Sequence, residues 1–223
     1  MNAAVVKVGG SLATCPQKLR NLCLKISEIS KEHKLIVVPG GGEFADVVRR
    51  LDKRFHLSCN TSHRMAILGM DQYGMLLSNL IPSSITTSKF EEIKYFLDMD
   101  KLPIFLPSNL LLQEDPLENS WAVTSDSIAV YLAGRLKVTK VLLVTDVDGI
   151  YSNDPKTVSD AKLIKNLSAS ELLVMKKRTS VDKALPKLLL KTPLDCYVIN
   201  GVFPERIKLA LEGQDAIYTL IKG

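Results

Sequence analysis

The sequence predicts an α/β protein, a three-layer α/β/α sandwich with a largely parallel central sheet. Short apolar runs alternate with amphipathic helical segments from end to end. Three of these runs end in glycine pairs or in an Asp-Gly turn, as expected at the carboxyl edge of a parallel sheet. The 223 residues contain no linker and no internal repeat, so we expect a single domain that covers residues 1–223.

The first part of the chain predicts a strand–helix–strand unit followed by a second helix. Residues 5–8 and 35–38 are short, apolar and rich in β-branched residues, which is typical of buried parallel strands. Between them, apolar residues recur at helical spacing from Leu19 to Ile29. Another helix begins where three glycines end, and its apolar positions run from Phe44 to Phe55.

The remaining elements follow the same alternation of strands and helices. We predict helices over residues 62–79, 90–99, 125–136 and 204–211, and strands over 104–106, 140–145, 196–199 and 217–221. Ser168 and Glu171 form a capping box that opens a further helix. Pro186 suits the first turn of another helix, which implies a break near Lys183. Residues 150–165 are expected to be more irregular.

Composition and charge favour a globular protein that acts on small molecules. The chain is 46% hydrophobic and 24% charged, and its net charge is only +5. Lysines and arginines are scattered, so we expect no nucleic-acid partner. No apolar stretch reaches membrane-spanning length, and no signal-peptide pattern opens the chain, so we expect a cytoplasmic protein that binds no membrane. The four cysteines lack metal-ligand spacing, and we assign no metal-binding residue.

Two glycine loops give the strongest functional signal. The first strand leads into Gly9-Gly10-Ser11, and the second leads into Gly40-Gly41-Gly42-Glu43. Glycines let backbone N–H groups approach an anion, and the positive end of the helix after Gly42 points to the same place. Lys7 adds a fixed positive charge. Two such loops on one sheet edge favour two phosphate groups held side by side, which phosphoryl transfer requires.

Other phosphate-binding motifs are absent from the sequence. There is no G-x-x-x-x-G-K-[ST], no G-x-G-x-x-G after a strand, and no H-R-D or D-F-G pair. A plain tight turn would explain Gly9 and Gly10 taken alone. A third strand end, Asp146-Val147-Asp148-Gly149, favours a functional site over that alternative.

In order along the chain, these motifs resemble those of the amino acid kinase family. The resemblance covers Lys7-Val-Gly-Gly-Ser11, the three glycines, Thr124-Ser-Asp126, and the stretch from Thr145 through Tyr151 to Lys156. It implies ATP as the phosphoryl donor, Mg²⁺, and a homo-oligomer. It also implies an acceptor-binding half over about 1–120 and a nucleotide-binding half over about 121–223.

The resemblance implies a role for each matching residue. Lys7 contacts the transferring phosphoryl group, and Asp126 orients the catalytic lysines. The family's Gly-Gly-Met-x-x-Lys segment is replaced here by Thr179-Ser-Val-Asp-Lys-Ala-Leu-Pro-Lys187, so Lys183 is the expected second lysine and Lys187 the alternative. The expected nucleotide-binding residues are Gly9, Gly10, Ser11, Thr145, Asp146, Asp148, Gly149, Tyr151 and Lys156. The expected acceptor-binding residues are Gly40, Gly41, Gly42, Glu43, Asp46 and His63.

A small branch of the family, which acts in methanofuran biosynthesis, is similar to this chain in three segments, Pro39–Asp46, Ala66–Gly74 and Val181–Lys187. This resemblance implies an archaeal source or a C1-metabolising relative. That branch phosphorylates [5-(aminomethyl)furan-3-yl]methyl phosphate to its diphosphate. Such an acceptor carries an ammonium group, for which Glu43, Asp46 and Asp71 are the candidate acids. Uridylate kinase is the alternative within the family, and a non-catalytic nucleotide- or oxyanion-binding protein is the alternative of another class. Lys7 and Asp126 together favour catalysis. Trp121 is interpreted as a packing residue.

Overall fold

A computed structural model describes residues 3–153, 157–158, 160–175 and 179–223. The strands are β1 (Ala4–Val8), β2 (Leu35–Pro39), β3 (Ser84–Thr87), β4 (Leu102–Phe105), β5 (Lys140–Thr145), β6 (Ile150–Tyr151), β7 (Leu163–Ile164), β8 (Asn166–Ser168), β9 (Asp195–Asn200) and β10 (Thr219–Lys222). The helices are the 3₁₀ turn η1 (Gly10–Thr14), α1 (Pro16–Ile29), α2 (Gly42–Phe55), α3 (Cys59–Leu80), α4 (Phe90–Asp98), α5 (Ser108–Glu114), α6 (Ser125–Leu136), α7 (Ala169–Val174), α8 (Leu185–Leu189) and α9 (Glu205–Leu211).

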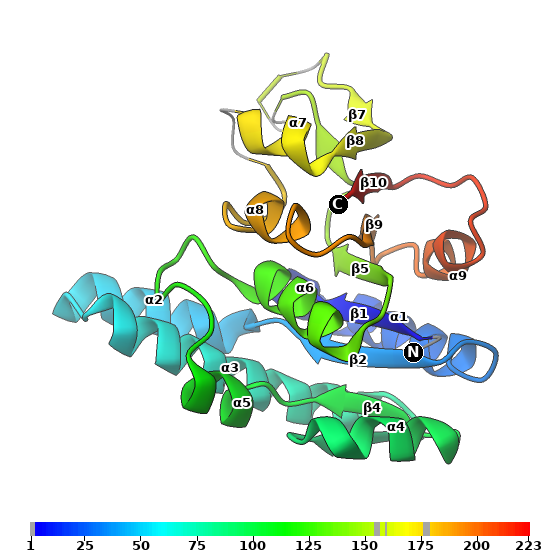
Figure 1. Cartoon of the computed structure of the whole chain (residues 1–223), viewed down its shortest axis with the longest axis horizontal. Helices are drawn as coiled ribbons and strands as arrows, with labels where there is room; N and C mark the ends of the chain where they lie inside the picture. Colours follow the sequence, from blue (N-terminus) through cyan, green and yellow to red (C-terminus); the bar gives the residue numbers. More distant parts are fainter. Residues whose placement is uncertain (1–2, 154–156, 159, 176–178) are drawn as a thin grey trace.

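An eight-stranded sheet forms the centre of the molecule, in the order β3-β4-β2-β1-β5-β9-β10-β8 (Figure 1). From β3 to β9 neighbouring strands are parallel, whereas β10 runs antiparallel to β9 and parallel to β8. Strands β6 and β7 form a separate antiparallel pair. The largely parallel sheet predicted from the sequence is therefore confirmed.

Helices cover both faces of this sheet, which gives the three predicted layers. Strand β1 shows why, because its successive side chains alternate between the two faces. Val5 joins one buried cluster, with apolar residues of α4, α5, α6, α7 and α8. Val6 and Val8 join the other cluster, with residues of α1, the second half of α3, and α9. An α/β/α sandwich follows from this alternation.

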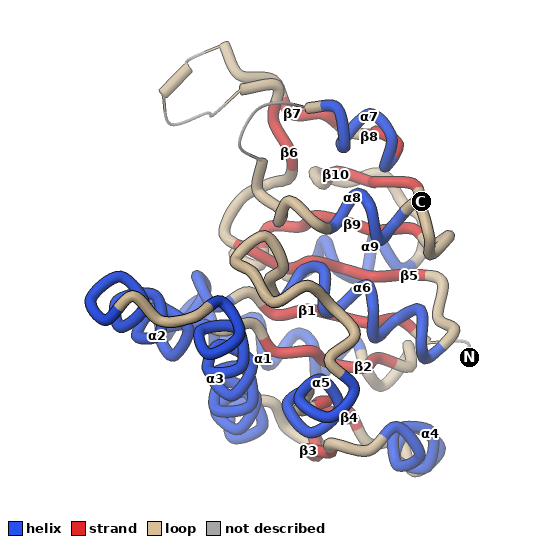
Figure 2. The backbone as a smooth tube through the Cα atoms, turned by 60° about the vertical axis from the view of Figure 1, so that its left-hand side comes forward, coloured by secondary structure: helices blue, strands red, loops and turns tan. Residues whose placement is uncertain are grey.

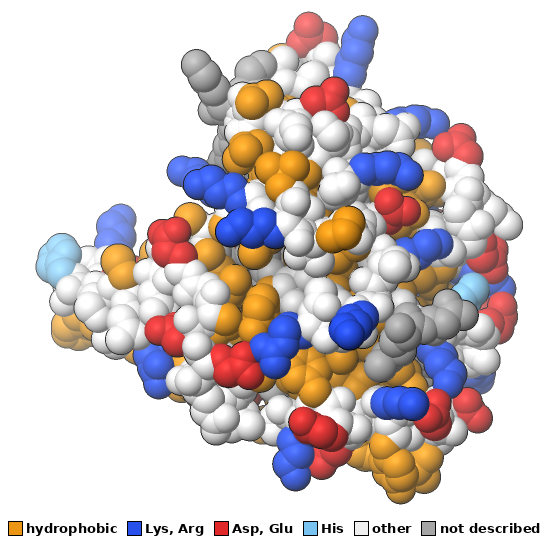
Figure 3. Space-filling model, in the orientation of Figure 1, with side chains coloured by type: hydrophobic (Ala, Val, Ile, Leu, Met, Phe, Trp, Pro, Cys, Tyr) orange, Lys and Arg blue, Asp and Glu red, His pale blue; other side chains and the backbone are white. Residues whose placement is uncertain are grey.

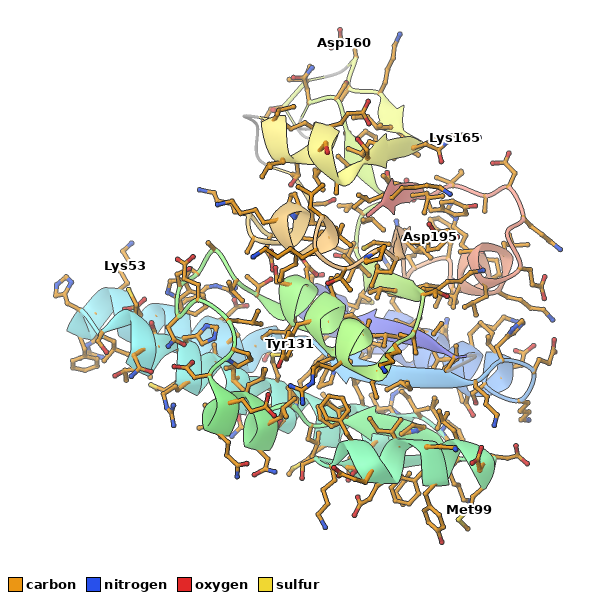
Figure 4. All side chains as sticks on the ribbon, in the orientation of Figure 1. Lys53, Met99, Tyr131, Asp160, Lys165 and Asp195 are labelled. Carbon is orange, nitrogen blue, oxygen red and sulfur yellow. The ribbon has the colours of Figure 1, made fainter. Side chains whose placement is uncertain are left out.

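The carboxyl ends of β1, β2 and β5 meet on one side of the molecule. Helices α2 and α3 pack against each other and project from that side (Figure 2). Figure 4 shows the same polarity, since Asp195 at the start of β9 lies far from Lys53 in the last turn of α2. The glycine loops that follow β1 and β2 therefore share one edge of the sheet.

Several element bounds differ from the sequence expectation. Helix α3 begins at Cys59 rather than at residue 62, because Ser58 accepts a capping hydrogen bond from the Thr61 N–H at 3.1 Å. Strand β4 begins two residues earlier than predicted and includes Pro103. Proline has no N–H group to donate to a neighbouring strand. Strand β4 tolerates Pro103 because the residue of β4 that pairs with β2 is Ile104. The capping box of Ser168 and Glu171 opens α7 as expected.

The surface carries mixed charges. On the face drawn in Figure 3, lysine and arginine side chains are spread out, with acidic side chains between them. Within the described parts of the chain, no helix combines the length and the hydropathy that crossing a membrane requires.

Candidate active site

A buried ion pair lies beneath the glycine loops. Lys7 is the fourth residue of β1, and its side chain leaves the sheet on the face that α6 covers. Its Nζ atom lies 2.6 Å from Oδ1 of Asp126 in the first turn of α6, and the two side chains are 7% and 10% exposed. A lysine inside an apolar strand requires such a partner. The structure thus joins Lys7 and Asp126, two of the three residues expected to be catalytic.

The two glycine loops touch each other through their backbones. The Gly9 N–H donates to the Val144 carbonyl at 2.7 Å, and the Gly40 N–H donates to the Val8 carbonyl at 2.8 Å. A Cβ atom on Gly10 would lie 2.1 Å from both N and Cα of Gly42, so this contact permits only glycine. Gly42 itself has φ +54°, a conformation that favours glycine.

Further contacts fix the shape of this double loop. A Cβ atom on Gly41 would lie 2.4 Å from Cβ of Ala45 in the first turn of α2. Tyr73 of α3, whose ring is buried, donates a hydrogen bond from its hydroxyl to the Gly9 carbonyl at 3.3 Å. The loops therefore form a rigid cradle of bare backbone at a helix N-terminus, an arrangement suited to phosphate.

A cavity of about 260 Å³ opens beside the cradle. It lies between the glycine loops, the facing surfaces of α2 and α3, and the chain that enters α6. Its lining residues are Gly10, Ser11, Gly41, Gly42, Ala45, Asp46, Arg49, His63, Ala66, Ile67, Met70, Trp121, Val123, Thr124, Ser125 and Ile128. The expected acceptor residues Gly41, Gly42, Asp46 and His63 are thus brought together.

One ion pair lines this cavity. Asp46 and Arg49 are one turn apart on α2, and Nη1 of Arg49 donates to Oδ1 of Asp46 at 2.6 Å. The Arg49 guanidinium also lies over the Trp121 ring, 4.8 Å from its centroid. Trp121 in turn donates its Nε1–H to Asp52 at 2.7 Å. The sequence did not predict that Arg49 and Trp121 line this cavity.

His63 is a buried residue of the cavity wall. Only 8% of it is exposed, so it is no surface cap. Burial lowers the pKa of its imidazole, and the nearby Asp115 carboxylate acts in the opposite direction. The cavity therefore favours a neutral imidazole, which can donate one hydrogen bond and accept another.

Two expected acids lie away from the cavity lining. Glu43 is exposed on the first turn of α2. Asp71 accepts hydrogen bonds from both the backbone N–H, at 3.2 Å, and the hydroxyl of Ser108 at the start of α5. Burial raises the pKa of Asp71. Of the three acids considered for an ammonium group, only Asp46 lines the cavity.

Several of the expected nucleotide-binding residues lie at or near the carboxyl end of β5. Asp146 is exposed, and its Oδ1 accepts from the Ser11 hydroxyl at 3.0 Å and from the Thr145 hydroxyl at 3.2 Å. These hydrogen bonds join the first glycine loop to the end of β5. Ser11, Thr145 and Asp146 are therefore neighbours, as the sequence motifs predicted.

Asp148 organises the next part of this loop. Its Oδ1 accepts from Nη1 of Arg206 at 2.5 Å and from Nδ2 of Asn200 at 3.1 Å, and the Tyr151 hydroxyl lies 3.5 Å from its Oδ2. The pKa of Tyr151 is raised by burial and by the Asp148 carboxylate. The structure thus shows Asp148 engaged in holding the loop, with an arginine that the sequence did not single out.

Gly149 follows with φ +151°, a backbone conformation that L side chains rarely adopt. A Cβ atom there would lie 2.4 Å from the Thr219 hydroxyl oxygen. Lys156 lies outside the described residues.

The two candidate second lysines are both exposed. Lys183 directly precedes the N-cap of α8, and Lys187 lies within that helix. Neither forms an ion pair with any residue that the structure describes. Their neighbour Asp182, by contrast, is bonded to the start of α6.

Comparison with known proteins places this geometry in a family. The model of the amino acid kinase family matches residues 2–190. The chain belongs to the amino acid kinase family. It is 39% identical over 221 residues to [5-(aminomethyl)furan-3-yl]methyl phosphate kinase of Methanocaldococcus jannaschii, which covers 98% of this chain and 97% of the relative. The uridylate kinase of Archaeoglobus fulgidus is 26% identical over 97% of this chain and 98% of its own length.

Solved structures of related kinases share the fold of this chain. The crystal structure of the A. fulgidus uridylate kinase superimposes with a TM-score of 0.77, at 25% identity, over 98% of this chain and 99% of that chain. The UMP kinase of Ureaplasma parvum superimposes with a TM-score of 0.74, at 19% identity, which shows the fold alone. The protein is a kinase, as its relatives are.

Proposed function

We propose that this kinase transfers the γ-phosphoryl group of ATP to the phosphate of [5-(aminomethyl)furan-3-yl]methyl phosphate, giving the diphosphate. The observation that carries the proposal is the direct contact of the two glycine loops beside the Lys7–Asp126 pair. One loop holds the donor phosphates and the other the acceptor phosphate, so both lie next to one buried positive charge. Phosphoryl transfer needs this positioning and charge neutralisation more than covalent chemistry.

The cavity supports a small acceptor that carries both signs of charge. Its volume of about 260 Å³ lies below the usual range of roughly 300–1,000 Å³ for ligand pockets. The backbone N–H groups at the start of α2 suit the acceptor phosphate. Asp46 offers a carboxylate to the ammonium group of the acceptor. Arg49 neutralises this carboxylate until the acceptor binds. The 39% identical relative is named as the kinase of this furan phosphate.

The chain's own residues divide the work. Lys7 neutralises negative charge on the transferring group, and Asp126 fixes the direction of the Lys7 side chain. Lys183, or in its place Lys187, supplies a second positive charge from the solvent side. The glycine cradle fits phosphate groups because no side chain fills it.

Ser11, Thr145 and Asp146 would hold the nucleotide phosphates with Mg²⁺. When bound, this ion would neutralise charge between the phosphates, and it commonly uses one or two carboxylates together with phosphate oxygens. Asp146 is exposed and suits this role. The expected homo-oligomer stays a prediction. Its test is whether the mass in solution exceeds the 24.6 kDa of one chain.

Uridylate kinase activity is the second candidate. The A. fulgidus uridylate kinase favours it, because both its sequence alignment and its structural superposition extend over nearly the whole chain. In that case Lys7, Asp126 and the two glycine loops would keep their roles, and the cavity would have to accept a nucleotide.

A steady-state assay of ADP release in ATP and Mg²⁺ separates the candidates. The acceptors are the furan phosphate, UMP, isopentenyl phosphate, glutamate and aspartate. We expect kcat/KM to be highest for the furan phosphate, and a preference for UMP would contradict this acceptor. Asp46→Asn should raise KM for the furan phosphate about 10- to 150-fold, as loss of a partner for a charged group costs roughly 1.5–3 kcal/mol. Glu43→Gln, its exposed control on the same helix turn, should leave KM unchanged.

A further inference from the structure

Asp182 caps two helices at once. Its Oδ2 accepts hydrogen bonds from the N–H of Thr124 at 2.8 Å, the hydroxyl of Thr124 at 3.0 Å and the N–H of Ser127 at 3.0 Å. Its Oδ1 accepts from the Ser127 hydroxyl at 2.5 Å and from the N–H of Leu185 at 2.9 Å. Neither α6 nor α8 is capped by the side chain of its own N-cap residue. One carboxylate therefore accepts one first-turn N–H group from each helix, that of Ser127 in α6 and that of Leu185 in α8.

The backbone of the same residue reaches the catalytic pair. The Asp182 N–H donates to Oδ2 of Asp126 at 3.3 Å, while Oδ1 of Asp126 binds Lys7. The Asp126 carboxylate is thus held at both oxygens. Because the side chain of Asp182 is anchored on α6, its own N–H is presented to Asp126 in one direction only.

The segment 179–185 also contacts both substrate sides of the site. On the acceptor side, the Ala184 N–H donates to the Ala122 carbonyl at 3.1 Å, between the cavity residues Trp121 and Val123. On the nucleotide side, the Ser180 hydroxyl donates to the Gly149 carbonyl at 3.0 Å. This segment carries Lys183, so one stretch of chain connects a candidate lysine with both halves of the site.

We propose that Asp182 is a positioning residue for phosphoryl transfer, which fixes Asp126 and the cavity wall at 121–125 relative to the segment that carries Lys183. The inference rests on the proposed kinase reaction. Asp182 acts through other residues, since five donors already occupy its two oxygens and it does not line the acceptor cavity.

Two substitutions remove the hydrogen bonds of the Asp182 side chain to different extents. Asp182→Ala removes all five acceptor interactions and should lower kcat about 100-fold, the usual effect of a misplacement of roughly 1 Å, with KM for ATP changed less. Asp182→Asn is isosteric but turns one oxygen into a donor that faces the Leu185 N–H. It should lower kcat about tenfold, the lower end for residues that orient a site.

The fluorescence of Trp121 provides a readout that does not depend on turnover. Trp121 is the only tryptophan of the chain and precedes by one residue the Ala122 carbonyl that the segment holds. Release of the segment should shift its emission in Asp182→Ala and leave it nearly unchanged in Asp182→Asn. Asp215→Ala is the matched control, because Asp215 is 86% exposed and pairs with Lys165 on the surface. It should change neither kcat nor emission.

The outcomes separate this inference from the choice of acceptor. The kinetic assays use the acceptor that the wild type turns over. If the wild type turns over none of the acceptors, the proposed function is contradicted. The Trp121 emission then still tests whether Asp182 anchors the segment. Wild-type kcat with wild-type emission in Asp182→Ala would overturn the proposal. If Asp182→Ala does not fold, Asp182→Asn decides: a tenfold lower kcat, measured well below the melting temperature of the variant, supports the proposal, and wild-type kcat overturns it.

Discussion

The Lys7–Asp126 pair places two opposite charges inside the molecule, where the side chains are 7% and 10% exposed. Burial of such a pair contributes little net stability, because desolvation offsets most of the Coulomb attraction. An apolar pair would suit β1 equally well. The charges are therefore explained by chemistry at the neighbouring glycine loops rather than by stability.

Removal of either partner should stop the reaction and weaken the fold. Lys7→Ala and Asp126→Asn should each lower kcat at least about 100-fold, since preorganised charge near the transition state is lost. Each should also lower the free energy of unfolding by about 3–5 kcal/mol through the unpaired buried group, and the variants should still fold. Activity assays and urea unfolding measure both effects.

Lys25→Ala is the control for this pair, because Lys25 binds Glu28 one turn away on the surface. It should alter neither kcat nor stability by a measurable amount. Near-normal turnover in Lys7→Ala would contradict the assignment of phosphoryl transfer to this site.

His63 predicts a pH dependence of stability. Burial lowers the pKa of its imidazole below the ordinary value of 6.5, so the unfolded chain binds this proton more readily than the folded protein. The stabilising contribution of the neutral form is complete above that value and is lost as the pH falls through the folded-state pKa. His63→Gln should remove this part of the acid sensitivity.

Urea unfolding of wild type and His63→Gln at about pH 7.5 and about pH 5 measures the difference. We expect the wild type to lose more free energy of unfolding on acidification than the variant does. Equal losses in the two proteins would show that His63 titrates normally.

At the scale of elements, the contact between the two glycine loops is the tightest constraint on the site. A Cβ atom on Gly10 would lie 2.1 Å from the backbone of Gly42, and backbone cannot move aside as a flexible side chain can. The loops directly follow β1 and β2, and backbone hydrogen bonds tie Gly9 to Val144 of β5 and Gly40 to Val8 of β1. Donor and acceptor phosphates would therefore lie at a separation that the sheet determines.

Gly10→Ala should force the loops apart. We expect kcat to fall at least about 100-fold, because the two phosphates lose their alignment, and stability to fall by about 1–3 kcal/mol from overpacking. Gly213→Ala is the matched control, since Gly213 has φ +70° and nothing lies within 4 Å of its added Cβ. It should cost about 1–2 kcal/mol through backbone strain alone, with kcat unchanged. Wild-type kcat in Gly10→Ala would contradict the close approach of the loops in catalysis.

The sequence predicted the elements with strong apolar patterns best. Strand β5 and helix α6 have the predicted bounds, because β5 is a continuous run of buried apolar residues and α6 carries one apolar face. No strand was predicted at β3, since three of the four residues in Ser84-Ile-Thr-Thr87 are polar and the strand forms a partly exposed edge. The reversed direction of β10 was also not predicted, because strand pairing depends on contacts between distant segments.

At the scale of the whole molecule, the sheet assembles the site from widely separated parts of the chain. Motifs that are continuous in sequence could be recognised in advance: Lys7 with the first glycines, the second glycine loop, and Asp126. Arg49, Trp121 and Asp182 could not, because each acquires its role from a partner in another segment. A lone aspartate or tryptophan carries no sequence signal for such a partner.

Phosphorus-31 NMR of the reaction products tests the central claim most directly. The protein is mixed with ATP, Mg²⁺ and the furan phosphate, and the acceptor phosphate resonance is followed. The account predicts that this resonance is replaced by a coupled pair from a new phosphate–phosphate bond, in step with ADP formation. ADP with inorganic phosphate alone, or an unchanged acceptor resonance, would contradict transfer to a phosphate group.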